Sequence, residues 1–253
     1  METMARSPNR LLLLILVLAF PVTLLVHPGR NVLATIQCPP GEAWNGCECV
    51  HTPIIIDTGG EGFHLTSAED GVAFDFLGDG HPVHTAWTAV NSRNAFLALD
   101  RNHNGKIDDG GELFGNVTKQ PKSRRPNGFL ALAEFDKPEN GGNGDGVIDH
   151  RDAVFAHLLL WIDENHDGIS QANELHSLPD LGVYSLALKY KESKRTDQFG
   201  NVFRYKASVN PDPNDGESKD GRWAYDVFFT MIDEKGNKFR PPIEDGISPF
   251  PQP

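Results

Sequence analysis

The chain has 253 residues, of which 39% are hydrophobic, and its formal net charge is −12 at pH 7. This length allows one large domain or two small ones. The acidic balance argues against a nucleic-acid partner, because binding to phosphates requires a surplus of Lys and Arg. The same balance is compatible with metal cations, which bind anionic oxygen ligands.

The first 34 residues have the pattern of a secretory signal peptide. Two arginines precede an apolar run from Leu11 to Val26, and Val32-Leu33-Ala34 offers a cleavage site after Ala34. The apolar run is shorter than the ~20 residues that span a membrane. We therefore expect an exported protein, secreted or at the cell surface. The alternative is a leader that stays uncleaved and anchors the chain in the membrane.

Residues 35–52 are predicted to form a short linker that contains all three cysteines of the chain, Cys38, Cys47 and Cys49. Export would permit a disulfide bond between two of them, and it would leave one thiol over. Their spacing matches no usual zinc pattern. A linker stapled by one disulfide bond is therefore the interpretation that we prefer.

A folded module is expected from residue 53 to residue 235. It begins with the β-branched run Ile54-Ile55-Ile56, which is typical of a buried strand. Further strand-like runs occur on both sides of the middle of the module, in 72–76, 82–88, 95–99, 183–190, 201–208 and 222–232. Short helical patterns occur between them, in 128–135, 152–159 and 171–178. The tail, 236–253, is rich in Pro and is expected to be extended.

The first chemical motif is a complete match to the EF-hand loop pattern D-x-[DN]-x-[DN]-G-x5-E, in Asp163–Glu174. Such a loop surrounds Ca²⁺ with about six to eight oxygen atoms from positions 1, 3, 5, 7, 9 and 12, and Gly at position 6 permits the turn. The expected ligands are Asp163, Asn165, Asp167, the Ile169 carbonyl, Gln171 and Glu174. Position 8 is usually apolar but is Ser170 here, which weakens ordinary strand pairing between loops.

A second loop, Asp100–Glu112, begins in the same way but is one residue longer. Position 12 is Gly111, and the first glutamate follows it as Glu112. A flexible Ca²⁺ shell can absorb the extra residue, with Asp108 and Glu112 closing the site. The expected ligands are Asp100, Asn102, Asn104, Lys106 at the carbonyl position, Asp108 and Glu112.

A third loop, in residues 136–152, fits the pattern at positions 3, 5, 6, 8 and 12 but has Gly141 at position 1. Asp136 would supply the missing carboxylate if residues 137–142 bulge outward. The expected ligands are Asp136, Asn143, Asp145, Val147 at the carbonyl position, Asp149 and Asp152. Two partial matches to the same loop pattern begin at Asp57 and Asp75. Because each lacks a ligand at position 3, we interpret them as turns.

Only residues 153–162 join the third loop to the one that begins at Asp163, and this is too short for two full EF-hand helices. The loops therefore belong to a different scaffold. We predict an α+β fold, with antiparallel β-strands flanking a central region of short helices and EF-hand-like calcium loops. No arrangement of a nucleophile, a base and a third orienting group is found, so no catalytic residues are predicted.

The three loops and their flanks, in this order, resemble a family of bacterial exoproteins. Its motifs are D-x-N-x-N-G-x-I-D-x-G-x-E-L-F-G, N-G-D-G-V-I-D and W-x-D-x-N-x-D-G-x-S-x-x-x-E-L, and the counterparts here run Asp100–Gly115, Asn143–Asp149 and Trp161–Leu175. The family is the EF-hand-like calcium-binding module of RTX-type exoproteins, and it includes the self-processing module of iron-regulated RTX proteins. The resemblance implies Ca²⁺-dependent folding outside the cytoplasm.

In the self-processing members, Ca²⁺ triggers cleavage of an Asp-Pro bond just upstream of the module. No such bond lies between Cys38 and Asp100, and the one Asp-Pro bond of this chain is Asp212-Pro213. The preferred hypothesis is therefore a secreted binding or structural module that Ca²⁺ stabilises and that has an unknown protein or surface partner. Two alternatives are Ca²⁺-triggered self-processing at Asp212-Pro213 and a dockerin-like adaptor, which would present an exposed apolar helix face near Asp152–Leu159.

Overall fold

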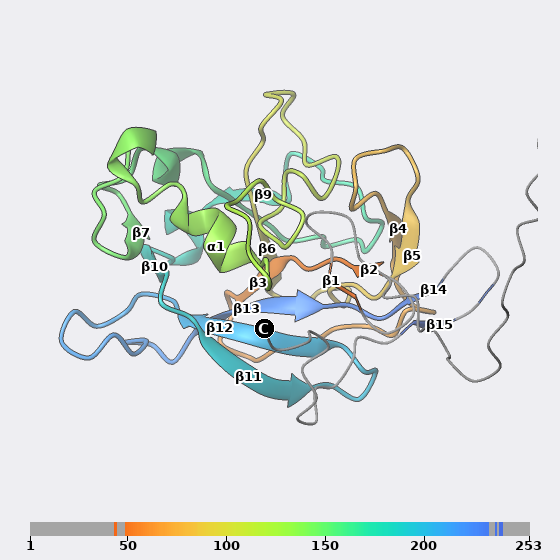
Figure 1. The fold of residues 1–253 in the computed structure, drawn as a ribbon. Helices are drawn as coiled ribbons and strands as arrows, with labels where there is room; N and C mark the ends of the chain where they lie inside the picture. Colours follow the sequence, from red (N-terminus) through yellow and green to blue (C-terminus); the bar gives the residue numbers. More distant parts are fainter. Residues whose placement is uncertain (1–42, 45–48, 233–235, 237, 240–253) are drawn as a thin grey trace, which may run out of the picture. The chain divides into compact units, whose positions relative to one another are not determined.

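The computed structural model describes residues 43–44, 49–232, 236 and 238–239 (Figure 1). The predicted leader, Cys38 and Cys47 in the linker, and most of the Pro-rich tail lie outside these residues. At the start of the described part, β1 (Ala43–Trp44) and β2 (Cys49–Val50) pair in an antiparallel ribbon.

The centre of the fold is an antiparallel sheet of seven strands in the order β11-β12-β13-β3-β6-β8-β9. Its strands are β11 (Lys191–Thr196), β12 (Val202–Ser208), β13 (Trp223–Phe228), β3 (Ile54–Asp57), β6 (Asn94–Ala98), β8 (Leu159–Trp161) and β9 (Leu175–Ser177). The first strand of the sheet in the sequence, β3, lies beside the last, β13, and Ile55 faces Tyr225 in this pair. The sheet therefore joins the two ends of the module.

Both faces of this sheet are covered by apolar side chains. Ile54 and Ile56 lie in one hydrophobic cluster and Ile55 lies in another, because successive side chains of a strand point to opposite faces. The second cluster is rich in aromatic rings, and Trp87 packs in it with 4.4 Å between its ring centroid and that of Phe96. Burial on both faces explains why the sequences of β3, β6 and β8 are almost continuously apolar.

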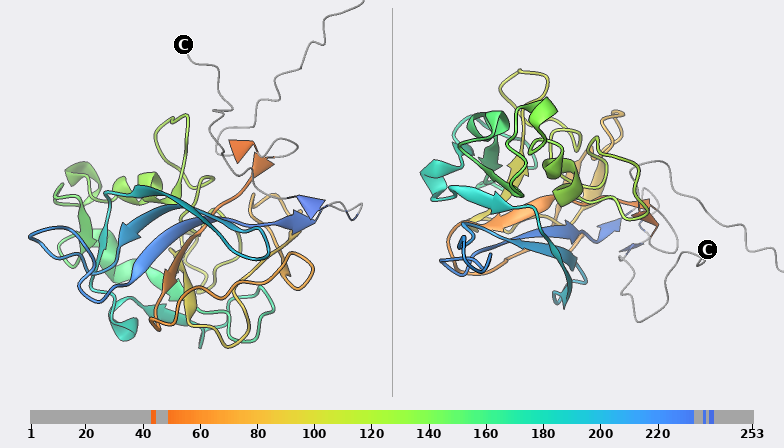
Figure 2. Two further views of the ribbon diagram at one scale, coloured as in Figure 1. Left: turned by 90° about the horizontal axis from the view of Figure 1, so that it is seen from below. Right: turned by 60° about the vertical axis from the view of Figure 1, so that its left-hand side comes forward.

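Smaller sheets and short helical segments complete the fold (Figure 2). A four-stranded sheet contains β4 (Val72–Phe74), β5 (Val83–Thr85), β14 (Met231–Ile232) and β15 (Lys238–Phe239), and a pair contains β7 (Val147–Asp149) and β10 (Ser185–Ala187). The helical segments are α1 (Gly128–Ala133) and the 3-10 turns η1 (Pro138–Asn140), η2 (Ala153–His157) and η3 (Pro179–Leu181).

Helix α1 confirms the helical pattern predicted in 128–135. The side chain of Asn127 caps it by accepting a hydrogen bond from Leu130 N over 3.0 Å. Gly128 is required where the helix begins, because a Cβ atom there would collide with the side chain of Ile54. Among the described residues, no helix is long and apolar enough to cross a membrane.

The predicted α+β class is wrong, because the described chain is mostly β and contains α1 as its one α-helix. The expected helix in 152–159 is the short η2 turn followed by β8, and the expected helix in 171–178 is a turn followed by β9. The apolar run that ends at Trp161 pairs with β6, so tertiary pairing overrides the local helical pattern. None of the three acidic loops lies between two α-helices, so no complete EF-hand is present in the described residues.

Candidate functional site: three acidic loops

The Asp163 loop, residues 163–174, begins two residues after the end of β8 in the seven-stranded sheet. The Asp163 carboxylate accepts hydrogen bonds from Asp167 N (3.1 Å) and Gly168 N (2.8 Å), at positions 5 and 6. Its Oδ2 atom also accepts a bond from the Trp87 indole over 2.7 Å. The first carboxylate of the loop is thus held both by the loop backbone and by the aromatic core.

Glu174 closes the same loop from its other end. Its Oε1 atom accepts a bond from Glu164 N (3.1 Å), and its Oε2 atom accepts bonds from Gln171 N (3.1 Å) and from the Trp161 indole (3.2 Å). Asp163 is 2% exposed and Glu174 is 1% exposed. Within the described residues neither carboxylate has a Lys or Arg partner, although buried charge normally requires compensation.

The Asp100 loop, residues 100–112, repeats this framework. Asp100 accepts bonds from Asn104 N (3.2 Å) and Gly105 N (2.8 Å), and Glu112 accepts bonds from Arg101 N and Asp108 N, both over 2.9 Å. Glu112 is 3% exposed. It therefore occupies the place that Glu174 holds in the Asp163 loop, and the extra residue of this loop does not displace it.

The Asp136 loop, residues 136–152, has the same arrangement, although its first carboxylate comes from a residue before the loop pattern begins. Asp136 accepts bonds from Gly144 N (3.0 Å) and Gly146 N (2.9 Å), while Asp152 accepts bonds from Asn143 N (3.2 Å) and Asp149 N (2.8 Å). Residues 137–142, which include η1, form an insertion between Asp136 and the loop. The structure thus places Asp136 at the start of the loop, as the bulge hypothesis requires.

The backbones of the three loops share two left-handed residues, at positions 4 and 6. They are His103 and Gly105, Gly144 and Gly146, and His166 and Gly168, with φ between 59° and 83°. The His166 ring also connects the Asp163 loop to two other segments, because its nitrogens lie 2.7 Å from Thr88 O and 2.7 Å from Asp70 O. Both partners are distant in the chain, so no local pattern predicts these contacts.

The middle side chains of the loops are exposed and face one another. Asn165 Nδ2 lies 2.9 Å and Gln171 Nε2 lies 2.8 Å from Asp167 Oδ2, and Asn143 Nδ2 lies 3.1 Å from Asp145 Oδ2. Rotation of such an amide by 180° would direct its oxygen to the same point.

The donor set of each loop is mixed. Within the described residues, no three His, Cys, Asp or Glu side chains gather closely enough to hold a metal ion by themselves. The loops also offer amide oxygens and the carbonyl positions Lys106, Val147 and Ile169. A set of carboxylate, amide and carbonyl oxygens fits Ca²⁺ rather than a metal that prefers nitrogen or sulfur.

Arg151 forms ion pairs with two carboxylates inside the Asp136 loop. Its Nη2 atom lies 2.6 Å from Asp145 Oδ2 and 2.6 Å from Asp149 Oδ2. The hydrogen bond from the Arg151 side chain is the largest cause that lowers the pKa of Asp149. This loop therefore contains an internal cation. Arg151 was not among the residues predicted from the sequence, although a basic residue beside position 12 of an acidic loop was a visible signal.

The other candidate regions have less suitable geometry. Asp57 and Asp75 accept bonds from loop amides as Asp163 does, for example from Gly62 and Gly80 over 2.7 Å, but their loops have no counterpart of Glu174 among the described residues. The face expected for a dockerin-like adaptor is not exposed, because Val154, Phe155 and Leu158 are buried. The exposed apolar face that the adaptor hypothesis requires is therefore absent at these residues.

The Asp212-Pro213 bond lies in the exposed loop between β12 and β13. Asn214 N donates to the Asp212 carboxylate over 2.8 Å, and this bond is the largest cause that lowers the pKa of Asp212. Gly216 N donates to the Asp212 carbonyl over 2.7 Å. The Asp212 carboxylate therefore accepts its hydrogen bond from the backbone of the turn in which it lies.

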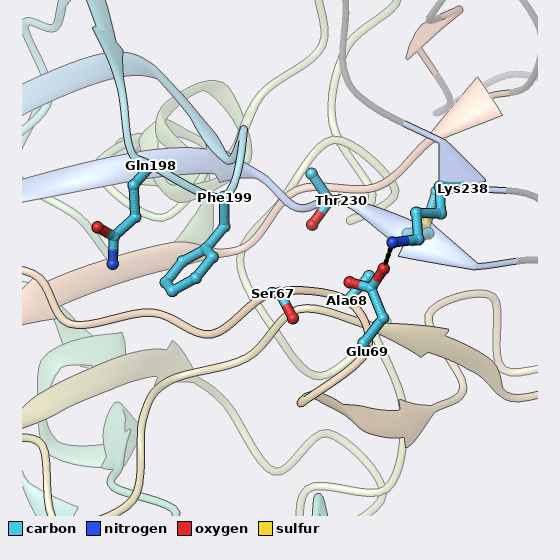
Figure 3. A pocket seen from close by; sticks show the side chains of 8 residues that line it. Ser67, Ala68, Glu69, Gln198, Phe199, Thr230 and Lys238 are labelled. Atoms are coloured by element: carbon cyan, nitrogen blue, oxygen red, sulfur yellow. Dashed lines mark ion pairs between the residues drawn. The ribbon is translucent and has the colours of Figure 1, made fainter.

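A pocket of about 210 Å³ has none of the candidate ligands in its lining (Figure 3). Glu69 forms an ion pair with Lys238 at its rim. Its lining consists of Ser67, Ala68, Glu69, Gln198, Phe199, Thr230, Met231 and Lys238. The two opposite charges satisfy each other, so the pocket presents no convergent set of free polar groups.

Comparison with known proteins places the module in a family. The SPM domain model matches residues 54–230. The iron-regulated protein FrpA of Neisseria meningitidis serogroup C is 40% identical over 162 residues, which are 63% of this chain and 14% of FrpA. The relation to FrpA-like proteins that the loop motifs predicted is confirmed, although the chain matches only this small part of FrpA. Because the domain match covers more than half of the chain, this protein belongs to the SPM domain family.

Proposed function

We propose that the Asp100, Asp136 and Asp163 loops bind Ca²⁺ and that this binding stabilises the fold of an exported binding or structural module. The observation that carries the proposal is the pair of carboxylates that closes each loop; five of these six side chains are buried, and Asp100 is half-buried. In the Asp163 loop, Asp163 and Glu174 are almost fully buried and lack a basic partner among the described residues. A divalent cation would supply the missing positive charge.

The loops would act on stability because their carboxylates are joined to the core. Unliganded carboxylates in one loop repel each other, so ligand binding becomes folding free energy. Trp87 and Trp161, which donate to Asp163 and Glu174, lie in the aromatic cluster with 5.6 Å between their ring centroids. Order in the Asp163 loop would thereby be transmitted to the packing of the central sheet.

The expected energy follows from the affinity typical of extracellular Ca²⁺ modules, a Kd of about 10⁻⁴–10⁻³ M. At about 10 mM Ca²⁺, one such site adds about 1.4–2.7 kcal/mol to the free energy of unfolding. Extracellular Ca²⁺ would then favour folding after export. The leader-like N-terminal sequence is the feature that supports export. The partner of the module would be another protein or a surface.

Thermal unfolding of the purified protein tests the proposal. We expect a clear rise of the Tm in millimolar Ca²⁺ relative to EGTA, and a much smaller rise in the same concentration of Mg²⁺, which prefers a smaller octahedral shell. Equal Tm values in Ca²⁺ and EGTA would refute the proposal. The intact mass after incubation with Ca²⁺ tests self-processing separately, since cleavage at Asp212-Pro213 would produce two fragments.

A further inference from the structure

Two of the candidate loops are joined by one serine hydroxyl. Ser170 and Ile107 both stand at position 8, Ser170 in the Asp163 loop and Ile107 in the Asp100 loop. Ile107 N donates to Ser170 Oγ over 2.7 Å, and Ser170 Oγ donates to Ile107 O over 3.3 Å. Ser170 is 4% exposed and Ile107 is 2% exposed. The hydroxyl thus satisfies both backbone groups of Ile107, as a paired strand residue would.

In ordinary paired EF-hand loops, position 8 is apolar and the two loops pair there through their backbones. Here the Ser170 side chain takes the place of that backbone pairing. The apolar residue of the Asp163 loop stands one position earlier, and Ile169 is 59% exposed. Ile107 instead packs in the aromatic-rich cluster of the core. The two loops are therefore connected by the side chain of Ser170 and not by its backbone.

The peptide unit between Lys106 and Ile107 connects this hydrogen bond to the candidate ligands. Its carbonyl is the position-7 ligand of the Asp100 loop, and its N–H is the group that donates to Ser170. A peptide unit is planar, so fixing the carbonyl fixes the direction of the N–H, and polarising the carbonyl strengthens that hydrogen bond. On the other side, the residue before Ser170 is Ile169, whose carbonyl is the position-7 ligand of the Asp163 loop.

We propose that Ser170 couples Ca²⁺ binding in the Asp100 loop to Ca²⁺ binding in the Asp163 loop. This inference rests on the proposed function of the loops. Ligation in either loop orders the Ile107–Ser170 contact and so lowers the ordering cost of ligation in the other. The Asp136 loop is excluded from this coupling, because its position-8 residue, Ile148, pairs with Leu186 of β10.

The test uses matched substitutions at position 5, where the side chain is exposed in all three loops. They are Asn104→Ala, Asp145→Ala and Asp167→Ala in the Asp100, Asp136 and Asp163 loops, respectively. Ca²⁺ titrations of the full-length protein are followed by NMR. The amide signals of Gly105 and Gly168, whose N–H groups bind the first carboxylate of each loop, report the two loops separately.

Coupling predicts that Asn104→Ala weakens Ca²⁺ binding at the Asp163 loop by about five-fold or more, in the range usual for coupled sites. Where each substitution abolishes Ca²⁺ binding in its own loop, Asp167→Ala weakens binding at the Asp100 loop by the same factor, because the coupling between two bound ions is reciprocal. Asp145→Ala should change neither. In a Ser170→Ala background these cross-effects should fall to about one-fold, and Ser170→Thr, which keeps the hydroxyl, should restore them.

Three results would overturn the inference. Cross-effects that persist unchanged in Ser170→Ala would show that another contact carries the coupling. Independent loops in the unmodified protein, with Ca²⁺ binding intact, would refute the coupling and leave the proposed function standing. Absence of Ca²⁺ binding in the unmodified protein would refute the proposed function itself. If Ser170→Ala fails to fold, the reciprocity of Asn104→Ala and Asp167→Ala still decides whether the loops are coupled.

Discussion

Substitution of Glu174 by Gln removes one negative charge from the Asp163 loop and nearly preserves the volume of the side chain. Glu174 accepts hydrogen bonds from two backbone amides and the Trp161 indole, whereas Gln has one acceptor oxygen and an NH₂ group that faces donors. A lost hydrogen bond to a charged group costs about 1.5–3 kcal/mol. Removal of a buried charge offsets part of this cost. The stability in EGTA therefore depends on two opposing terms.

The diagnostic quantity is the increment in unfolding free energy that Ca²⁺ adds. For one site with a Kd of about 10⁻⁴–10⁻³ M, the increment at about 10 mM Ca²⁺ is about 1.4–2.7 kcal/mol. Glu174→Gln removes the carboxylate that would contribute both oxygens, so we expect the variant to lose an increment of this size. At about 2–4 °C per kcal/mol for a domain of this length, the loss corresponds to several degrees in Tm.

The assay is urea unfolding in Ca²⁺ and in EGTA, followed by Trp fluorescence, since Trp87 and Trp161 contact the loop carboxylates directly. Glu164→Gln is the matched control. It removes the same charge from an exposed, non-ligand position of the same loop, and it should keep the full Ca²⁺ increment. The reasoning fails if Glu174→Gln keeps the same increment as the unmodified protein, or if both substitutions reduce it equally.

Two further predictions concern charge elsewhere in the module. Arg151→Gln removes the internal cation that bonds Asp145 and Asp149, so calorimetry should find tighter Ca²⁺ binding at the Asp136 loop and unchanged binding at the Asp163 loop; weaker binding would mean that Arg151 orders the ligands. Burial raises the pKa of Asp226 to about 7, against ~3.9 for an unfolded carboxyl. Its contribution to stability is therefore complete below about pH 4 and is lost as the pH rises through about 7, by at most about 4 kcal/mol. Asp226→Asn keeps an acceptor for Gly128 N and should flatten this decline in urea unfolding in EGTA at pH 5 and pH 8; an unchanged decline would assign it to other groups.

The local form of the loops follows from the sequence alone. An Asp at position 1 and residues that tolerate a left-handed backbone at positions 4 and 6 determine a turn whose amide groups bind that carboxylate, because all participants are close in the chain. The ordered set of three loop motifs was also specific enough to predict the relation to FrpA-like proteins. The buried strand at Ile54–Ile56 was likewise readable from its β-branched run.

The longer-range features were decided only by the tertiary structure. The runs in 152–159 and 171–178 suit a short helix locally, but the first forms only the η2 turn before β8 begins, and the second forms β9, which pairs with β8 in the sheet. Asp163 lies 76 residues from Trp87, and Ser170 lies 63 residues from Ile107. No local pattern encodes such contacts, because they depend on which strands the whole chain brings together. Sequence therefore determined the chemistry that each loop offers, and the fold determined how the loops contact the core and one another.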